Sequence, residues 1–292
     1  MKKFVFGSWS ISGDYGYKNE KETKKTLLEA YNKGIRQYDT APNYGHGYAE
    51  FVLGDTLSQK KNIIFNTKIG NNHSKKKSFS LKDIEKSFFK SLRNLKKINT
   101  LFLHNPRYEE DMDKLYLFLK DLKKNKLINN FGISLAKNFK YKKNDLEKYK
   151  IFQLDYNLLN FSIIKGIKNK IIYARSPLAS GLLARDFDLK KIKINDHRKT
   201  WLDNSRLSNI NLQKKFIKQN TSDDLIFNSI HFVKKTNFVN YIIFGTKNST
   251  QLEQMVSLYK KKNNTNFKDL TKKIKNNPRL FLKKAYWFYE NI

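Results

Sequence analysis

Short apolar segments alternate along the chain with longer segments whose apolar positions recur at helical spacing. Eight of the short segments are rich in β-branched and aromatic residues and end at polar or turn-forming residues, which predicts β-strands. These are residues 4–7, 37–40, 63–68, 100–104, 130–134, 151–155, 171–175 and 241–245. Helices are predicted between them, for example over 21–33, 81–95, 112–125 and 252–262.

The order of these segments predicts the fold. Strands that alternate with helices form a parallel sheet covered by helices, and eight such strands are the number of a closed (β/α)8 TIM barrel of the α/β class. The 292 residues suit one barrel, and no repeat or linker indicates a second domain. The polar segment 182–206 predicts a long loop after the seventh strand, at the barrel end where substrate sites lie.

Four polar residues stand at or just after the ends of consecutive predicted strands: Asp39, Tyr44, Lys68 and His104. Any one of them has an ordinary structural explanation, but parallel barrel strands bring their ends to one mouth. A phenol has a pKa of about 10, and a nearby ammonium stabilises its phenolate. Lys68 is therefore expected to lower the pKa of Tyr44, with Asp39 holding the lysine. His104 would donate a hydrogen bond to a substrate oxygen.

Composition narrows the function classes. The chain has 59 Lys and Arg against 26 Asp and Glu, a net charge of +33. This excess alone would suggest a nucleic-acid partner, but it is mostly Lys scattered among Asn, Ile and Phe, which A/T-rich codons also favour, and no nucleic-acid-binding motif accompanies it. We therefore expect no specific nucleic-acid partner. Nonspecific binding remains an alternative, recognisable by a steep loss of affinity with salt.

Cysteine is absent, which excludes disulfides and thiolate chemistry. The first apolar run, from Phe4 to Phe6, is too short for the core of a signal peptide, and no later segment has the length of a membrane span. A cytoplasmic location without membrane contact is the expectation.

Several segments resemble the aldo/keto reductase family. Residues 34–45, followed by Glu50 and Gly54, are similar to the first signature of that family, and Thr67-Lys68 and residues 103–106 are similar to its later catalytic segments. The family's catalytic Asp, Tyr, Lys and His fall on the four strand-end residues without a gap. The resemblance implies a barrel enzyme that transfers a hydride between a nicotinamide cofactor and a small carbonyl or alcohol substrate, with Trp9, Tyr44 and His104 contacting the substrate.

The resemblance also implies a cofactor site. Ser134 and Gln153 match contacts to the nicotinamide carboxamide, although Leu135 replaces a common Asn. Arg175 stands where many members have a Tyr that stacks on the nicotinamide, and from there the chain runs toward the pyrophosphate. Residues 245–254 are similar to the segment that binds the adenosine phosphate at a helix start. The implied cofactor residues are Ser134, Gln153, Arg175, Ser176, Leu178, Gly245, Thr246, Lys247, Gln251 and Gln254.

The preferred cofactor is expected to be NADP(H), with NAD(H) as the other candidate, because Lys247 could neutralise a 2′-phosphate. Lys247 as one more surface lysine remains the alternative. His46 and His73 lie near the predicted mouth, but they have no ligand cluster of suitable spacing, so no metal is expected.

The C-terminal tail starts at about residue 265 and is rich in aromatic residues from Pro278 onward. We expect that it either covers the barrel mouth or packs as a terminal helix. A redox-sensing or regulatory module with slow turnover is the alternative function. The substrate and the oligomeric state are left open.

Overall fold

The computed structural model describes residues 3–135, 143–161, 167 and 169–277. Eight parallel strands close into a barrel in chain order, with β1 also paired to β8. They are β1 (Phe4–Gly7), β2 (Gln37–Asp39), β3 (Ile64–Ile69), β4 (Thr100–His104), β5 (Asn130–Leu135), β6 (Ile151–Asp155), β7 (Ile171–Arg175) and β8 (Tyr241–Gly245). The predicted (β/α)8 barrel is confirmed.

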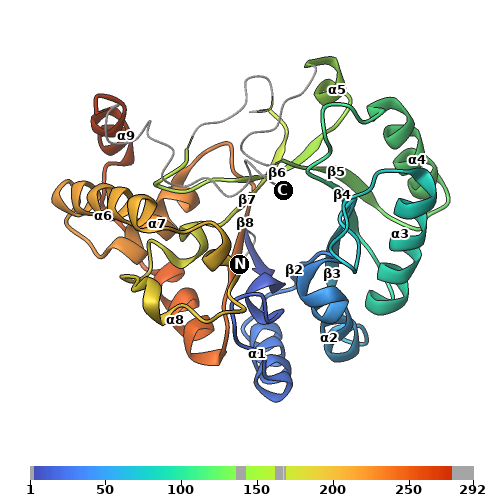
Figure 1. The fold of residues 1–292 in the computed structure, drawn as a ribbon, viewed down its shortest axis with the longest axis horizontal. Coiled ribbons are helices and arrows are strands. Elements are labelled where there is room, and N and C mark those ends of the chain that lie inside the picture. Colours follow the sequence, from blue (N-terminus) through green and yellow to red (C-terminus); the bar gives the residue numbers. More distant parts are fainter. Residues whose placement is uncertain (1–2, 136–142, 162–166, 168, 278–292) are drawn as a thin grey trace.

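Helices surround the strands (Figure 1). The described helices are α1 (Glu20–Asn32), α2 (Tyr48–Leu57), α3 (Leu81–Leu95), α4 (Met112–Lys124), α5 (Lys143–Glu147), α6 (Asn204–Gln219), α7 (Leu225–Lys235), α8 (Ser249–Lys260) and α9 (Phe267–Lys275). Side-chain caps explain several of their starts: Asn19 accepts from the Glu22 N–H, Ser80 from Asp83 and Asn248 from Gln251. None of the described helices is long and apolar enough to cross a bilayer.

Successive side chains along the strands point into two different apolar clusters. Val5, Phe102, Tyr173 and Ile243 pack in one small cluster, whereas their neighbours along the strands belong to the large core between strands and helices. Because side chains of a strand point to opposite faces in turn, residues two positions further along share the face of the small cluster. His104, Arg175 and Gly245 stand two residues beyond members of that cluster, so the strands direct them to the same face at its C-terminal end.

The connection after β7 is the long loop that was predicted, although it ends three residues earlier, because α6 begins at Asn204. Short 3-10 turns interrupt it at Ala179–Gly181, Leu189–Lys191 and His197–Thr200.

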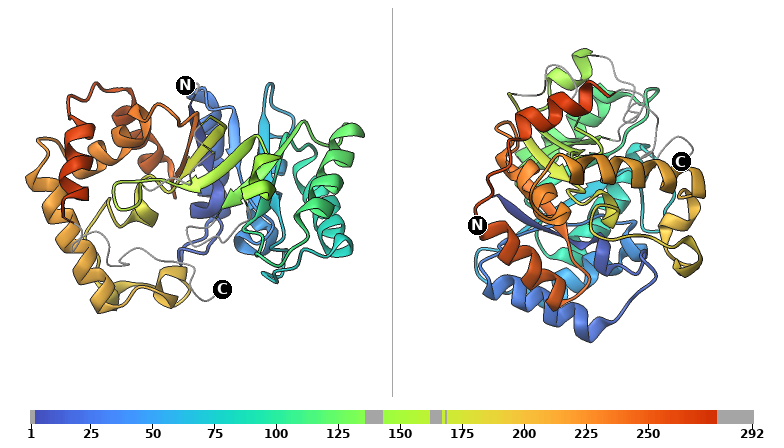
Figure 2. Two further views of the ribbon diagram at one scale, coloured as in Figure 1. Left: turned by 90° about the horizontal axis from the view of Figure 1, so that it is seen from above. Right: turned by 90° about the vertical axis from the view of Figure 1, so that its left-hand side faces the viewer.

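The chain after α8 runs along the outside of the helical ring. The ring of Phe267 packs on that of Phe232 in α7, and α9 lies at the periphery (Figures 1 and 2). The aromatic tail from Pro278 lies outside the described residues.

Candidate active site

The ammonium of Lys68 lies at the centre of a buried polar cluster at the barrel mouth. Its Nζ donates to Asp39 Oδ2 at 2.7 Å, to the Thr40 carbonyl at 2.7 Å and to Tyr44 Oη at 3.3 Å. The Lys68 and Asp39 side chains are only 1% and 4% exposed. A buried charge is tolerated when it is paired and hydrogen-bonded, and both conditions hold here. The structure thus brings together three of the four predicted catalytic residues.

The turn that carries Tyr44 requires glycine. Gly45 has a φ of 58°, and a Cβ there would come within 2.2 Å of the Ser12 carbonyl oxygen. Gly47 has a φ of 93°, and a Cβ there would meet the His73 ring at 2.6 Å. These two positions let the chain turn back over the β1 loop. Tyr44 is held against that loop as a result.

Burial controls the protonation of the cluster. Burial, and after it the negative charge of Asp39, raise the pKa of Tyr44 above the ordinary value of a phenol. This is opposite to the expected lowering by Lys68, because burial disfavours the charged phenolate and is the largest effect on Tyr44. Burial also lowers the pKa of Lys68, against the opposing effect of Asp39. In this state Tyr44 keeps its proton, which is the form that a proton donor needs.

His104 ends β4 beside Tyr44, with the two rings edge to face at 6.4 Å. Burial, followed by the positive charges of Lys68 and Arg175, holds the pKa of His104 well below the ordinary value of 6.5. The imidazole is therefore neutral at neutral pH. Among the described residues its buried Nδ1 has no hydrogen-bond partner. Because a buried polar atom is rarely left unpaired, this arrangement suits a site that pairs with a bound molecule.

Aromatic side chains form one wall beside Tyr44. The Trp9 indole stacks on the Tyr44 ring at 5.7 Å, and the His197 ring lies 4.3 Å from Trp9 and 4.5 Å from Tyr15. Trp9 comes from the β1 loop and His197 from the long loop after β7. Residues distant in sequence therefore meet at this side of the mouth.

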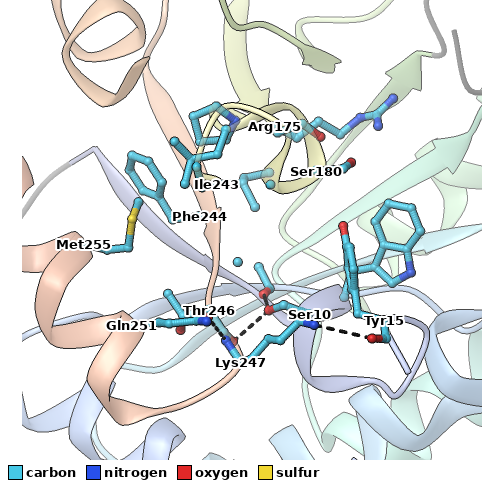
Figure 3. Close-up of a pocket in the computed structure, with 18 of the residues that line it drawn as sticks. Ser10, Tyr15, Arg175, Ser180, Ile243, Phe244, Thr246, Lys247, Gln251 and Met255 are labelled. Carbon is cyan, nitrogen blue, oxygen red and sulfur yellow. Dashed lines mark hydrogen bonds between the residues drawn. The ribbon is translucent and has the colours of Figure 1, made fainter. Parts of the chain in front are cut away.

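A cavity of about 320 Å³ leads from Tyr44 to the first turn of α8 (Figure 3). Eight of the ten predicted cofactor residues line it: Arg175, Ser176, Leu178, Gly245, Thr246, Lys247, Gln251 and Gln254. Trp9, Tyr44 and Asp39 line the same groove. The Thr246 Oγ1 is buried there without a partner among the described residues. An elongated groove with an unpaired hydroxyl, joining the catalytic cluster to a helix start, fits a dinucleotide.

The two remaining predicted cofactor residues lie beneath the catalytic cluster. Ser134 Oγ donates to Gln153 Oε1 at 3.1 Å, and Gln153 Nε2 donates to Asp39 Oδ1 at 2.7 Å. Both side chains are buried. In this arrangement the carboxamide of Gln153 holds the second oxygen of Asp39 while Lys68 holds the first.

Arg175 was expected against the nicotinamide. Its guanidinium pairs with Asp155 at 3.2 Å and donates to the Leu135 carbonyl at 2.9 Å, while the residue also lines the groove. In Figure 3 the side chain extends away from Ile243 and Phe244. The ion pair fixes it across the ends of β5, β6 and β7.

Two cations that the sequence did not single out also line the groove. Arg198 is 3% exposed, pairs with Asp196 and donates from Nη1 to the Ser180 carbonyl at 3.1 Å. Arg185 lines the groove beside it. Both stand in the loop predicted as functional, but nothing in the local pattern distinguishes them from the many other cations of the chain.

Lys247 faces the same group of cations. Its Nζ donates to the Tyr15 carbonyl at 3.4 Å, a contact drawn as a dashed line in Figure 3. Burial, and after it the charge of Arg198, lower the pKa of Lys247 to about 8. Three cations at one stretch of groove indicate a site for phosphate groups.

The two histidines near the mouth have protein partners. His73 Nε2 bonds to the buried Glu50 at 2.9 Å, and the His46 Nδ1 bonds to the His73 carbonyl at 3.1 Å. Thr67 also donates to Glu50, at 2.6 Å. The described part of the chain contains no group of three or more His, Cys, Asp or Glu side chains placed to hold a metal ion.

Curated relatives match short segments of the chain. The NADH-specific methylglyoxal reductase of Escherichia coli K12 is 28% identical over 97 residues, which is 32% of this chain and 30% of that protein. The aldo-keto reductase YhdN of Bacillus subtilis is 37% identical over 54 residues, or 18% and 16% of the two chains. A putative voltage-gated potassium channel subunit beta of Schizosaccharomyces pombe is 36% identical over 59 residues, or 20% and 17%. The matched segments thus span less than a third of each of these relatives.

Solved structures match the whole fold. The glycerol dehydrogenase AKR11B4 of Gluconobacter oxydans superposes with a TM-score of 0.73 at 20% identity, covering 99% of this chain and 94% of that one. The holo form of the aldo-keto reductase AKR11C1 of Bacillus halodurans gives a TM-score of 0.72 at 20% identity with the same coverage. The model of the aldo/keto reductase family matches residues 3–275, and the protein therefore belongs to that family.

Proposed function

We propose that the protein is an NAD(P)H-dependent oxidoreductase that reduces aldehyde or ketone carbonyls, or oxidises the corresponding alcohols, with Tyr44 as proton donor. The observation that carries this proposal is the buried Lys68 ammonium, bonded to both Asp39 and the Tyr44 hydroxyl at the end of a groove of dinucleotide shape. The proposed cofactor contacts are the eight groove residues together with Ser134 and Gln153. Small carbonyl or alcohol compounds are the proposed substrates.

The residues have separate roles. The reduced nicotinamide supplies the hydride when it is bound. Tyr44 passes its hydroxyl proton to the substrate oxygen, which is a stronger base than phenolate once it has alkoxide character. The ammonium of Lys68 then stabilises the phenolate left on Tyr44. His104, neutral at neutral pH, donates an N–H to the same oxygen and orients the carbonyl.

Asp39 and Gln153 act through Lys68. The two oxygens of Asp39 accept from Lys68 and Gln153, both at 2.7 Å, so the carboxylate cannot rotate away from the lysine. This fixes the ammonium under Tyr44. The buried setting excludes water from the proton path, which strengthens every charge interaction within it.

The relatives suggest the size of the substrate. The methylglyoxal reductase of Escherichia coli and the glycerol dehydrogenase of Gluconobacter oxydans are named after methylglyoxal and glycerol, which are both small and polar. In the present chain Trp9, Tyr15 and His197 pack against one another beside Tyr44, and such an aromatic wall suits a compact substrate.

Steady-state oxidation of NADH and of NADPH tests the proposal. The purified protein is supplied with methylglyoxal, other short aldehydes and glyceraldehyde, and the loss of reduced cofactor is followed. Sustained turnover supports it, and glycerol with oxidised cofactor tests the reverse direction. Cofactor binding without turnover on any of these compounds would contradict the enzyme assignment.

The likeness to a putative channel beta subunit favours a second candidate, a redox-sensing or regulatory module. A sensor oxidises at most about one equivalent of bound cofactor and then stops. With an excess of methylglyoxal as the hydride acceptor, a single-turnover experiment with equal amounts of protein and NADPH, compared with about a hundredfold excess of cofactor, separates the two functions.

A further inference from the structure

The first turn of α8 already holds a carboxylate from another part of the chain. Glu22 of α1 reaches across, and its Oε1 accepts a hydrogen bond from the Ser249 backbone N–H at 3.1 Å. Thr26 of α1 supports this contact, because its Oγ1 lies 3.4 Å from both Glu22 Oε1 and Ser249 Oγ. The two helices are therefore joined at the point where α8 begins.

Neighbouring N–H groups of this turn are also used. Gln251 N donates to the Asn248 side chain at 2.9 Å, and Lys247 N donates to Gln251 Oε1 at 2.9 Å (Figure 3). The start of a helix attracts anions through such N–H groups and through its dipole. Here Glu22 and Asn248 satisfy two N–H groups of the helix start, and Gln251 satisfies the Lys247 N–H just before it.

Lys247, the cation that the sequence suggested for a 2′-phosphate, points elsewhere. Lys247 Nζ lies by the Tyr15 carbonyl and faces Arg198 and Arg185, in the part of the groove that leads back toward the catalytic cluster. A cation there serves the phosphates that NADH and NADPH have in common.

The two cofactors differ only at the adenosine ribose, where NADPH has a 2′-phosphate and NADH a hydroxyl. A phosphate monoester carries a charge of about −1.5 to −2 near neutral pH. Placed at the first turn of α8, it would meet the carboxylate of Glu22 and would have to displace it from Ser249. A 2′-hydroxyl can instead donate a hydrogen bond to a carboxylate, as acidic residues of other dinucleotide sites do.

We propose that Glu22 makes the protein prefer NADH to NADPH by occupying the anion site at the start of α8. This inference rests on the proposed function, since it requires that the groove holds a nicotinamide dinucleotide. It also reverses the preference that Lys247 suggested in the sequence.

Equilibrium binding tests the inference without any substrate. Fluorescence titration gives the Kd values of NADH and NADPH for the wild type, for Glu22→Gln and for Glu20→Gln. Glutamine keeps an acceptor for the Ser249 N–H but removes the charge. Glu20 is the matched control, because it lies on the same helix and pairs with Lys24 at 2.9 Å on the surface.

The wild type is expected to bind NADH more tightly, and Glu22→Gln is expected to shift the ratio of Kd values toward NADPH by roughly tenfold, chiefly through tighter NADPH binding. Glu20→Gln should leave the ratio unchanged. A wild type that prefers NADPH, or a ratio that moves less than about threefold in Glu22→Gln, overturns the inference while leaving the proposed function intact. Failure of the wild type to bind either cofactor overturns both.

Discussion

Tyr44 is the residue on which the proposed chemistry depends most directly. Its hydroxyl accepts from Lys68, and its ring stacks on Trp9. Tyr44→Phe keeps the ring and removes the proton that the substrate oxygen would receive. We expect the rate of carbonyl reduction to fall on the order of 10²-fold or more, with the Kd of the cofactor nearly unchanged. Rate assays and fluorescence titration of the same preparations measure both. Wild-type turnover in the variant would exclude Tyr44 as the acid.

Lys247 should make cofactor binding sensitive to pH. Burial and the charge of Arg198 lower its pKa to about 8, so the charged form that attracts phosphate predominates at pH 7 and is lost as the pH rises through that value. From pH 7 to pH 9 we expect the affinity for NADH to fall by up to roughly tenfold.

Titration of NADH at a series of pH values checks this expectation, because NADH has no phosphate monoester that ionises in the range. The control is Lys247→Met, which should bind more weakly at pH 7 and show little change up to pH 9. A wild-type Kd that stays constant, or the same pH dependence in both proteins, would mean that Lys247 does not meet the cofactor.

At the scale of elements, Asp14 connects three loops at the barrel mouth. Its Oδ2 accepts from the Trp9 indole at 3.0 Å and from the Gly45 N–H at 3.2 Å, and its Oδ1 accepts from Lys75 at 2.8 Å. These partners belong to the loops after β1, β2 and β3. Its backbone carbonyl also accepts from His197 N, at 2.8 Å, in the loop after β7.

Removal of this carboxylate should loosen the wall beside Tyr44. For Asp14→Ala we expect kcat/KM to fall roughly tenfold or more, because small displacements of reacting groups are costly, with the Kd of NADH changed by less than about twofold. Asp188→Ala is a suitable control, since Asp188 lies in the loop after β7, where its carboxylate has local partners: Lys191 at 3.8 Å and the Lys190 N–H, which it caps at 3.0 Å. Equal losses in both variants, or a parallel loss of cofactor affinity, would argue against a role in positioning Trp9 and Tyr44.

At the scale of the whole molecule, the net charge of +33 repels itself. Between about 10 mM and 100 mM salt the Debye length shrinks from about 30 Å to about 10 Å, which screens this repulsion in the compact state more than in the expanded chain. We expect the midpoint of thermal unfolding to rise by a few degrees over that range, where about 1 kcal/mol corresponds to roughly 2–4 °C. Calorimetry in NaCl measures it. A midpoint that falls with salt would show that surface ion pairs outweigh the repulsion.

The sequence predicted the barrel well because its signal is local. The strands β1, β4, β6, β7 and β8 have the predicted bounds, since each is a short apolar run that ends at a polar or turn residue. The helix α2 was not predicted, because its pattern is blurred: the apolar Phe51 is half exposed, whereas the charged Glu50 is buried. The contrast between an apolar and a polar face that marks a helical period is therefore weak. The helix α6 is largely polar, and the segment predicted as a loop therefore extended into its first residues.

The catalytic cluster lay within reach of the sequence because strand ends converge in any parallel barrel. The spacing along the chain therefore placed Asp39, Tyr44, Lys68 and His104 at one mouth before any distance was known. The resemblance of residues 245–254 and of the segment after Arg175 to the aldo/keto reductase family likewise indicated the groove that Ser176 and Thr246 line.

The partner of each polar side chain was decided only by the tertiary structure. Gln153 bonds to Asp39 across 114 positions of the chain, and Ser249 bonds to Glu22 across 227. Arg175 pairs with Asp155, and the phenol of Tyr44 has a raised pKa where a lowered one was expected. Local patterns encode periodicity and strand ends, because these depend on neighbouring residues. Hydrogen bonds and burial depend on distances of a few ångströms between elements, which strand register and helix packing set only when the whole barrel has closed.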